Sequence, residues 1–157
     1  MSGNPVIAAL QAANPAAVVG TGLHRGQASV EIAPAEIVAV CRFLRDELQF
    51  ARLSGVTAVD WHPAEPRFEI VYLLHSLERN ERLRLKCRVP SGGAGIESVT
   101  AVWPGANWYE REVFDLFGIV FRNHPDLRRI MLPEGWEGHP LRKDYPVTGP
   151  KYTYSQE

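Results

Sequence analysis

Residues 107–118 mark the end of the folded domain, and they read Asn107-Trp108-Tyr109-Glu110-Arg111-Glu112-Val113-Phe114-Asp115-Leu116-Phe117-Gly118. The apolar side chains of this stretch recur at helical spacing and share one face, which carries Tyr109, Val113, Leu116 and Phe117. Gly118 stands where helices commonly end with a residue in the left-handed conformation. The pattern predicts an amphipathic helix that packs one face on the domain and stops at Gly118.

Polar residues of the same stretch predict how this helix begins. Asn107 is a suitable N-cap, and Glu110, three residues later, completes a capping-box pattern. Arg111 and Asp115 are four residues apart and are predicted to form an ion pair on the helix surface. Glu112 and Asp115 are also candidates for acid–base catalysis, but carboxylates in the N-terminal half of a helix more commonly interact with its dipole.

The residues before this helix alternate between strand and helix patterns. Strands are predicted at residues 16–22, 27–32, 56–61, 68–74, 82–89 and 97–103. Residues 4–13 predict a short helix, and Pro34 opens a second helix whose exit is marked by Gly55. The second helix has an apolar stripe formed by Ile37, Cys41, Leu44 and Leu48. Together the predicted strands and helices indicate an α+β domain over residues 1–121, with a mostly antiparallel or mixed sheet and helices packed on it.

Two of the predicted strands carry further information. Residues 68–74 are apolar at almost every position, which favours a central strand covered on both faces. Residues 82–89 alternate without a fault, so that one face is apolar and the other carries Arg82, Arg84, Lys86 and Arg88. We interpret this basic face as solvated or as protecting a sheet edge, with an acidic protein partner as the alternative. Nucleic acid is disfavoured, because no aromatic side chain that could stack on a base lies on it.

Composition limits the classes of function. The chain has 157 residues, a formal net charge of -1 and two cysteines, Cys41 and Cys87. Two thiols alone cannot hold an iron–sulfur cluster or a four-cysteine zinc site, so both are expected to be reduced and buried. The first 23 residues carry no charged side chain, but Pro5 and Pro15 interrupt them, which argues against a signal peptide or a membrane span.

The last segment, residues 122–157, has no sustained helical or strand period. Five prolines interrupt it, and its large apolar residues are spaced as separate anchors: Leu127, Ile130, Met131, Leu132, Trp136, Leu141 and Tyr145. Proline lowers the entropy lost when an extended peptide docks. We therefore predict an extended C-terminal arm that lies on another protein; the alternative is an arm folded back over its own domain.

Charged residues and histidines of the arm are weak candidates for a reactive site. His124, Asp126, His139 and Asp144 have no spacing typical of metal ligands, and each histidine precedes a proline that favours extended backbone. Ser91-Gly92-Gly93-Ala94-Gly95 lacks the lysine and helix start of a phosphate loop. Arginines among apolar anchors are typical of protein interfaces. The predicted partner-contacting residues are His124, Asp126, Arg128, Arg129, Trp136, His139, Leu141, Arg142, Lys143 and Tyr145.

Three stretches resemble one family in order along the chain. They are residues 107–118, then His124-Pro125-Asp126-Leu127-Arg128-Arg129-Ile130, then Gly138-His139-Pro140-Leu141-Arg142-Lys143-Asp144-Tyr145-Pro146. The family is the C subunit of NADH–quinone oxidoreductase (respiratory complex I), the 30 kDa subunit family. Residues 131–134 also resemble the J subunit of the plastoquinone-linked counterpart. Asn123 departs from the family, many members of which have glycine before the His-Pro pair.

The resemblance implies a non-catalytic scaffold subunit of the peripheral arm of the complex, with no catalytic, cofactor-binding or metal-binding residue of its own. FMN, iron–sulfur clusters, NADH and a quinone would belong to the holoenzyme, which passes electrons to quinone and translocates protons. The implied partners are chiefly the hydrogenase-like D subunit and the cluster-bearing B subunit, on the cytoplasmic face of the cell inner membrane. Membrane association would then come through partners only.

Two alternatives remain open from the sequence. The same subunit type could serve a membrane-bound hydrogenase or a dehydrogenase that uses another electron donor. The chain could instead be a stand-alone metal-dependent enzyme that uses the histidines and carboxylates of the arm, which would require a self-contained pocket.

Overall fold

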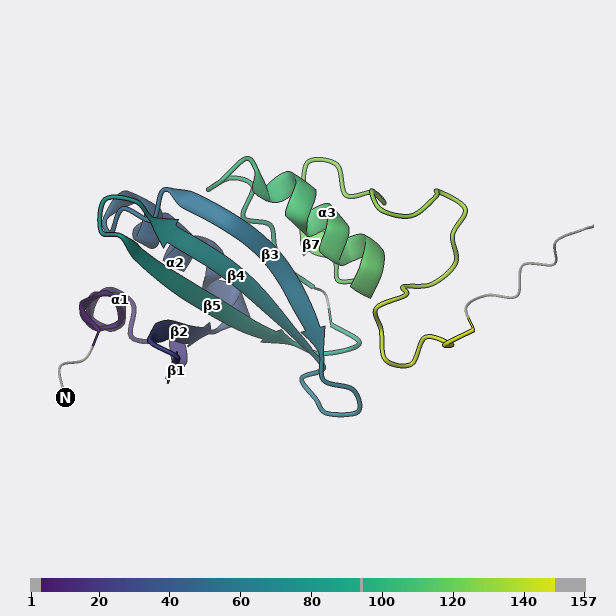
Figure 1. The fold of residues 1–157 in the computed structure, drawn as a ribbon, viewed down its shortest axis with the longest axis horizontal. Coiled ribbons are helices and arrows are strands. Elements are labelled where there is room, and N and C mark those ends of the chain that lie inside the picture. The colour runs from purple at the N-terminus through teal and green to yellow at the C-terminus, as the bar shows by residue number, and fades with distance from the viewer. Residues whose placement is uncertain (1–3, 94, 149–157) are drawn as a thin grey trace, which may run out of the picture.

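The computed structural model describes residues 4–93 and 95–148. Its elements follow the chain as α1 (Pro5–Ala13), β1 (Val18–His24), β2 (Gln27–Ile32), the 3-10 turn η1 (Pro34–Glu36), α2 (Ile37–Asp46), β3 (Arg52–Asp60), β4 (Phe68–Ser76), β5 (Glu81–Val89), β6 (Ile96–Glu97), α3 (Ala106–Phe117) and β7 (Phe121–Arg122). This order of strands and helices is the α+β architecture expected from the sequence, and Figure 1 shows the arm continuing beyond α3.

Five strands form a mixed sheet in the order β1-β2-β5-β4-β3. The pairs β1–β2, β3–β4 and β4–β5 are antiparallel, whereas β2 and β5 run parallel. A parallel pair needs a crossover connection, which here contains α2, β3 and β4. Because β5 lies inside the sheet, its row of cations cannot protect an edge, and that part of our interpretation is wrong. The edges are β1 and β3.

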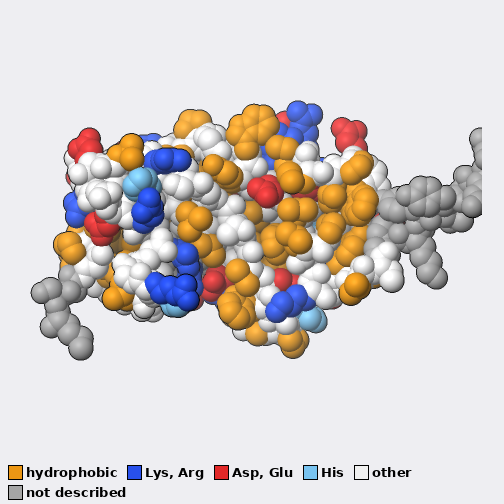
Figure 2. Space-filling model, viewed as in Figure 1, with side chains coloured by type: hydrophobic (Ala, Val, Ile, Leu, Met, Phe, Trp, Pro, Cys, Tyr) orange, Lys and Arg blue, Asp and Glu red, His pale blue; other side chains and the backbone are white. Residues whose placement is uncertain are grey.

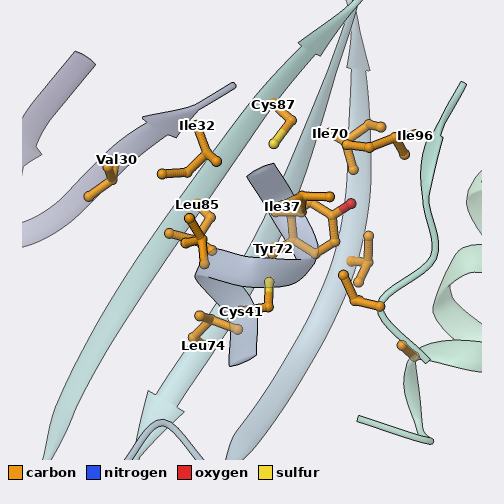
Figure 3. Close-up of a cluster of buried hydrophobic side chains, with 14 of the residues drawn as sticks. Val30, Ile32, Ile37, Cys41, Ile70, Tyr72, Leu74, Leu85, Cys87 and Ile96 are labelled. Atoms are coloured by element: carbon orange, nitrogen blue, oxygen red, sulfur yellow. The ribbon is translucent and has the colours of Figure 1, made fainter. Parts of the chain in front are cut away.

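The core fills one face of this sheet. In Figure 1, α2 lies behind the strands, and Figure 3 shows Ile37 and Cys41 of α2 against Tyr72 and Leu85 of the sheet. The predicted stripe of α2 is confirmed at Ile37, Cys41 and Leu44, which are fully buried. Burial raises the pKa of the Cys41 thiol well above its ordinary value.

None of the described helices covers the other face of the sheet in Figure 1. The prediction that residues 68–74 are covered on both faces is wrong, because Glu69 and Leu73 of β4 are only half-buried there. Their neighbours on this open face are Arg84, beside Leu73, and Arg88, beside Glu69. Long stems of such cations cover part of an open sheet face while their charged ends stay in water.

Two local predictions also fail, each for a tertiary reason. The strand predicted at residues 97–103 shrinks to β6, which pairs in parallel with β7, and Val102 and Trp103 instead donate backbone hydrogen bonds to Val99 in a turn. Gly55 does not mark the exit from α2, which already ends at Asp46. It lies inside β3, after an irregularity in the pairing with β4. A short apolar run cannot by itself distinguish a strand from a buried turn.

The ends of the helices follow from local chemistry. The side chain of Asn4 caps α1 by accepting hydrogen bonds from the amides of Val6 and Ile7, and Pro5 begins the helix. Gly118 ends α3 as expected, with φ +72°. The predicted capping by Asn107 is wrong, since α3 begins at Ala106 after Gly105. None of the described helices is long and apolar enough to cross a lipid bilayer.

Candidate interface formed by the C-terminal arm

The arm leaves the domain at β7 and runs beside α3 (Figure 1). Its described residues, 123–148, form turns and bends without a helix or strand. Residues 149–157, the remainder of the predicted arm, lie outside the described part of the chain. The arm's backbone is therefore held mainly by side chains, through hydrogen bonds to α3 and to the end of β3.

The first group of these bonds centres on Asp115, which is fully buried on α3. Its Oδ2 accepts hydrogen bonds from the amides of Ile130, Met131 and Leu132, at 3.0, 2.7 and 2.9 Å. Its Oδ1 accepts from the guanidinium of Arg129 at 2.6 Å. Burial alone would raise the pKa of Asp115, but these hydrogen bonds outweigh it and lower the pKa below its ordinary value. One ionised carboxylate thus fixes four consecutive residues of the arm.

The arm also caps the C-terminus of α3, where helix carbonyls lack partners within the helix. His139 donates from Nδ1 to the carbonyl of Asp115 at 2.8 Å, which assigns the proton to that nitrogen. The amide of Leu141 donates to Leu116 at 3.0 Å, and Nε of Arg142 donates to Phe117 at 2.6 Å. Arginine at this end also interacts favourably with the negative end of the helix dipole.

One turn before Asp115 on α3, Arg111 also reaches the arm. Its Nε and Nη2 donate to the carbonyls of Arg128 and Arg129, both at 3.1 Å. The predicted ion pair between Arg111 and Asp115 is therefore wrong. Each side chain faces the arm rather than its helical neighbour, so α3 presents both an arginine and an aspartate to the arm's backbone.

A second group of contacts ties the arm to the end of β3. Arg67 makes a bidentate ion pair with Asp60 of β3, at 2.8 Å for both hydrogen bonds, and it also contacts Asp144 of the arm at 2.7 Å. The amide of Lys143 donates to Asp60 at 2.8 Å. The hydrogen bonds from Arg67 are the main reason that the pKa of Asp60 is held far below its ordinary value.

A third group holds the start of the arm. His124 accepts from the amide of Asp126 at Nδ1, 3.0 Å, so Nε2 carries the proton and donates to the carbonyl of Asn107 at 3.2 Å. The same nitrogen lies 3.9 Å from Glu110, and both side chains are fully buried. Glu110 accepts from the Ser98 hydroxyl at 2.6 Å and from the Val99 amide at 2.7 Å. Burial raises the pKa of Glu110 to about 7.

The residues predicted to contact a partner therefore divide into two sets. His124, Arg129, His139 and Arg142 face inward and bind the chain's own backbone, as the alternative of an arm folded back over its domain implies. Asp126 and Arg128 form an exposed ion pair at 2.9 Å, and Lys143 and Leu141 are exposed. Trp136 and Tyr145 are half-buried. Contact of any of these residues with a partner stays a prediction.

Large apolar side chains are exposed beside these contacts. Trp108 of α3 is 60% exposed, and Met131 and Leu141 of the arm are 61% and 51% exposed. Figure 2 shows hydrophobic side chains gathered toward the end of the molecule where α3 and the arm lie. Ile130 and Val120 add to this set at 37% and 45%. Apolar side chains gathered on a water-exposed surface are typical of a protein interface.

Three residues important to this arrangement are not identified by the sequence patterns. Asp60, Arg67 and Glu110 are all buried charged residues, and each binds residues far away in the sequence or in a neighbouring turn. A charged residue at the end of an apolar strand is a signal that could have found Asp60, whereas the pattern around Glu110 indicates a capping role instead. Among the described residues, no group of three or more histidine, cysteine or acidic side chains is arranged to hold a metal ion.

Comparisons with known proteins give a consistent result. Residues 30–151 match the family model described as the respiratory-chain NADH dehydrogenase, 30 Kd subunit. The chain is 52% identical over 126 residues to the C subunit of NADH-quinone oxidoreductase from Geotalea uraniireducens, which covers 80% of this chain and 77% of the relative. It is 49% identical over 159 residues to the corresponding protein of Roseiflexus castenholzii, covering 98% and 91%.

Two solved structures share the fold. One is the trypsin-resistant fragment (1-134) of Nqo5, with a TM-score of 0.67 and 29% identity over 78% of this chain and 97% of that one. The other is a chain of the membrane-bound sulfane sulfur reductase, an archaeal respiratory membrane complex, with a TM-score of 0.77 and 28% identity over 91% and 85%. Both similarities extend over most of this chain.

Proposed function

Because this chain belongs to the family of the 30 kDa subunit of the respiratory-chain NADH dehydrogenase, we propose that it is a non-catalytic scaffold subunit of a proton-translocating NADH–quinone oxidoreductase. Eight curated relatives that are 44–52% identical are named as the C subunit of NADH-quinone oxidoreductase. FMN, iron–sulfur clusters, NADH and the quinone are then handled by other subunits. The protein reaches the cytoplasmic face of the cell inner membrane through those partners.

The observation that carries this proposal is that charged residues of the arm bind the domain, while apolar residues beside them stay exposed. Three charged residues of the arm bind the domain: Arg129 binds Asp115, Asp144 binds Arg67, and Arg142 binds the end of α3. These contacts fix the conformation of the arm. They leave the exposed apolar side chains of Trp108, Met131 and Leu141 as a pre-ordered surface, and pre-ordering lowers the entropic cost of binding. We propose that this apolar surface docks on the hydrogenase-like D subunit, near the B subunit.

The test uses the whole complex, captured through a tag on another of its proteins. The double variant Met131→Asp with Leu141→Asp places two charges on the apolar surface without touching the inward contacts. Because each introduced carboxylate would have to be desolvated on docking, we expect much less of this chain in the captured complex. The complex that does assemble should retain nearly normal NADH–quinone activity per particle.

Leu23→Asp is the matched control, because Leu23 is 75% exposed but lies on β1, far from the arm in the sequence and on another element. It should assemble normally. Normal assembly of the arm variant combined with lost turnover would instead indicate a direct catalytic role. Equal losses for the arm variant and the control would count against a docking surface at the arm.

A second candidate function is favoured by one specific observation. The chain from the membrane-bound sulfane sulfur reductase superposes with a higher TM-score than the Nqo5 fragment, 0.77 against 0.67. The same scaffold role in a respiratory complex that uses another electron donor, such as a membrane-bound hydrogenase, is therefore the alternative. Mass spectrometry of the captured complex decides between them, because NADH-binding flavoprotein subunits are present in the first case and absent in the second.

A further inference from the structure

On the open face of the sheet, we propose that a short acidic segment of a neighbouring protein binds in a trough between the cations of β5 and the small side chains of β1 and β2. The trough lies on different elements from the apolar surface of the arm. The inference goes beyond the scaffold role and does not depend on which electron donor the complex uses.

The pairing of the strands creates the trough. Gly22 of β1 lies beside Ser29 of β2, and Ser29 lies beside Arg84 of β5. Gly22 and Ser29, which have little or no side chain, therefore lie next to the long side chain of Arg84. The next row again has a glycine at the edge, Gly20, and a cation on β5, Lys86, but the acidic side chain of Glu31 lies between them. The floor is therefore low beside Arg84 and closes at Glu31.

Three hollows follow one another along this line. One of about 430 Å³ lies at the hairpin ends and is lined by Arg25, Gln27, Asn80 and Arg82 among others. The next, of about 210 Å³, shares Gln27 and is lined by Ser29, Arg84 and Lys86. The third, of about 230 Å³, shares Ser29 and Lys86 with the second and extends to Gly20 and Gly22. Because neighbouring hollows share lining residues, they lie next to one another, and we call the three together the trough.

The cations that line the trough have few acidic partners. Among residues 4–93 and 95–148, no carboxylate lies within ion-pair distance of Arg82 or Arg84. Lys86 approaches only Glu69, at 3.6 Å. Arg84 donates one hydrogen bond to the neutral Gln27 amide oxygen at 3.2 Å, while its Nε is buried and has no acceptor in the described part of the chain. An incoming carboxylate would give the Arg84 guanidinium the acidic partner that it lacks among the described residues.

The geometry selects an acidic protein segment rather than a longer polyanion. Arg82, Arg84 and Lys86 alternate along β5, so their side chains are spaced by about 6.6 Å, the repeat of every second residue in an extended peptide. Glu81 and Glu31 lie at the two ends of the trough. A nucleic-acid backbone running through the trough would pass both carboxylates, whereas a segment with acidic residues at alternate positions fits between them.

The first experiment uses the assembled complex, captured through a tag on this chain and treated with a carbodiimide that joins amines to adjacent carboxylates. We expect Lys86 to be joined to an acidic residue of another protein of the complex, in addition to Glu69 of its own chain. Acetylation of Lys86 should be slower in the complex than in the purified chain. Cross-linking to Glu69 alone, with unchanged acetylation, would overturn the proposal.

The second experiment uses the purified chain and a fluorescent five-residue peptide with glutamate at alternate positions, which matches the length of the cation row from Arg82 to Lys86. Arg84→Glu should weaken peptide binding by roughly tenfold, the change expected when one charge-assisted contact becomes repulsive. Arg82→Glu should weaken it similarly, whereas Arg42→Glu, an equally charged change on the exposed side of α2, should leave it unchanged. Circular dichroism checks that each variant is folded.

Competing ligands complete this test. A peptide with glutamine in place of glutamate should not bind. A ten-nucleotide RNA and vesicles of anionic lipid are added in parallel, and stronger binding of either than of the acidic peptide overturns the proposal. If the chain enters no complex but the peptide binds as expected, the scaffold function fails while the trough stands, so the two failures are distinguishable.

Discussion

Asp115 of α3 and Arg129 of the arm are joined by an ion pair of 2.6 Å, in which the aspartate is fully buried and the arginine side chain is 17% exposed. The same carboxylate binds three amides of the arm, and Arg129 also donates to the carbonyl of Gly138 at 3.0 Å. This pair connects α3, the middle of the arm and the turn at Gly138. The order of the arm therefore depends on charges inside the chain.

Asp115→Asn should release the arm from α3. The variant keeps the size of the side chain but leaves the partly buried Arg129 without its counter-charge, a change that typically costs about 3–5 kcal/mol. Urea unfolding of the purified chain measures the free energy of unfolding, and limited proteolysis measures accessibility of residues 128–142. Asp126→Asn is the control, since Asp126 is exposed and pairs only with Arg128. Equal stability of the two variants would contradict the central role of Asp115.

Glu110 should make the stability of the chain depend on pH near neutrality. Its pKa is raised by burial to about 7, above its ordinary value of 4.5. Between these two values the folded chain holds a proton that the unfolded chain releases, so the free energy of unfolding falls as pH rises, by at most about 1.4 kcal/mol per pH unit. Glu110→Gln should flatten this dependence in urea unfolding between pH 5 and 7. An unchanged slope would show that the carboxyl titrates normally.

Arg67→Lys should loosen the end of the arm while keeping the charge. Lysine cannot make two parallel hydrogen bonds to Asp60 while also reaching Asp144, as the guanidinium does. Because Asp60 also accepts from the amide of Lys143, we expect that amide to exchange its hydrogen faster. Hydrogen exchange followed by NMR measures this, with the amide of Leu85 in the buried sheet as an internal reference. Unchanged exchange at Lys143 would show that Asp60 is positioned without Arg67.

Arg142→Ala and Arg128→Ala should separate stability from docking. Arg142 donates to the carbonyl of Phe117, and loss of this bond should cost the isolated chain about 1–2 kcal/mol. Arg128 is 67% exposed and pairs with exposed Asp126, so its loss should change stability by less than about 0.5 kcal/mol. If Arg128 contacts a partner, Arg128→Ala should still lower the amount of captured complex. Normal assembly of this variant would remove Arg128 from the interface.

Gly118→Ala should disturb the arm through backbone and packing together. Gly118 has φ +72°, and a methyl group there would lie 2.6 Å from the side chains of Arg142 and His139. The left-handed conformation alone costs a non-glycine residue about 1–2 kcal/mol. We expect a lower melting temperature and increased proteolysis near residue 142. Gly105→Ala is the control, because nothing lies within 4 Å of a methyl group at that position.

Features of the fold that depend on neighbouring residues were predictable from the sequence. The stripe of Ile37, Cys41 and Leu44 and the end of α3 at Gly118 are set by helical period and backbone preference. The alternation of residues 82–89 also appears as predicted, with its apolar side buried. In each case the residues that decide the structure are within one or two turns of each other.

Features that depend on distant residues were not predictable. Local patterns allow Glu110 to complete a capping box and Asp115 to pair with Arg111, so they predict both. In the structure, Asp115 binds residues 14–17 positions later, and Asp144 meets Arg67 from 77 positions away. The position of β5 inside the sheet is likewise set by its parallel pairing with β2. No local pattern encodes these partners.

The parallel pairing of β2 with β5 also has a consequence for the order of folding during synthesis. The hairpins of β3, β4 and β5 join neighbouring segments, so they can form as soon as those residues leave the ribosome. The hairpin of β1 and β2 is made earlier but has no lateral partner until residue 83 is available. During that interval β2, whose Val30 and Ile32 end fully buried, lacks its neighbour β5. The nascent chain should therefore need protection from aggregation before β5 is complete.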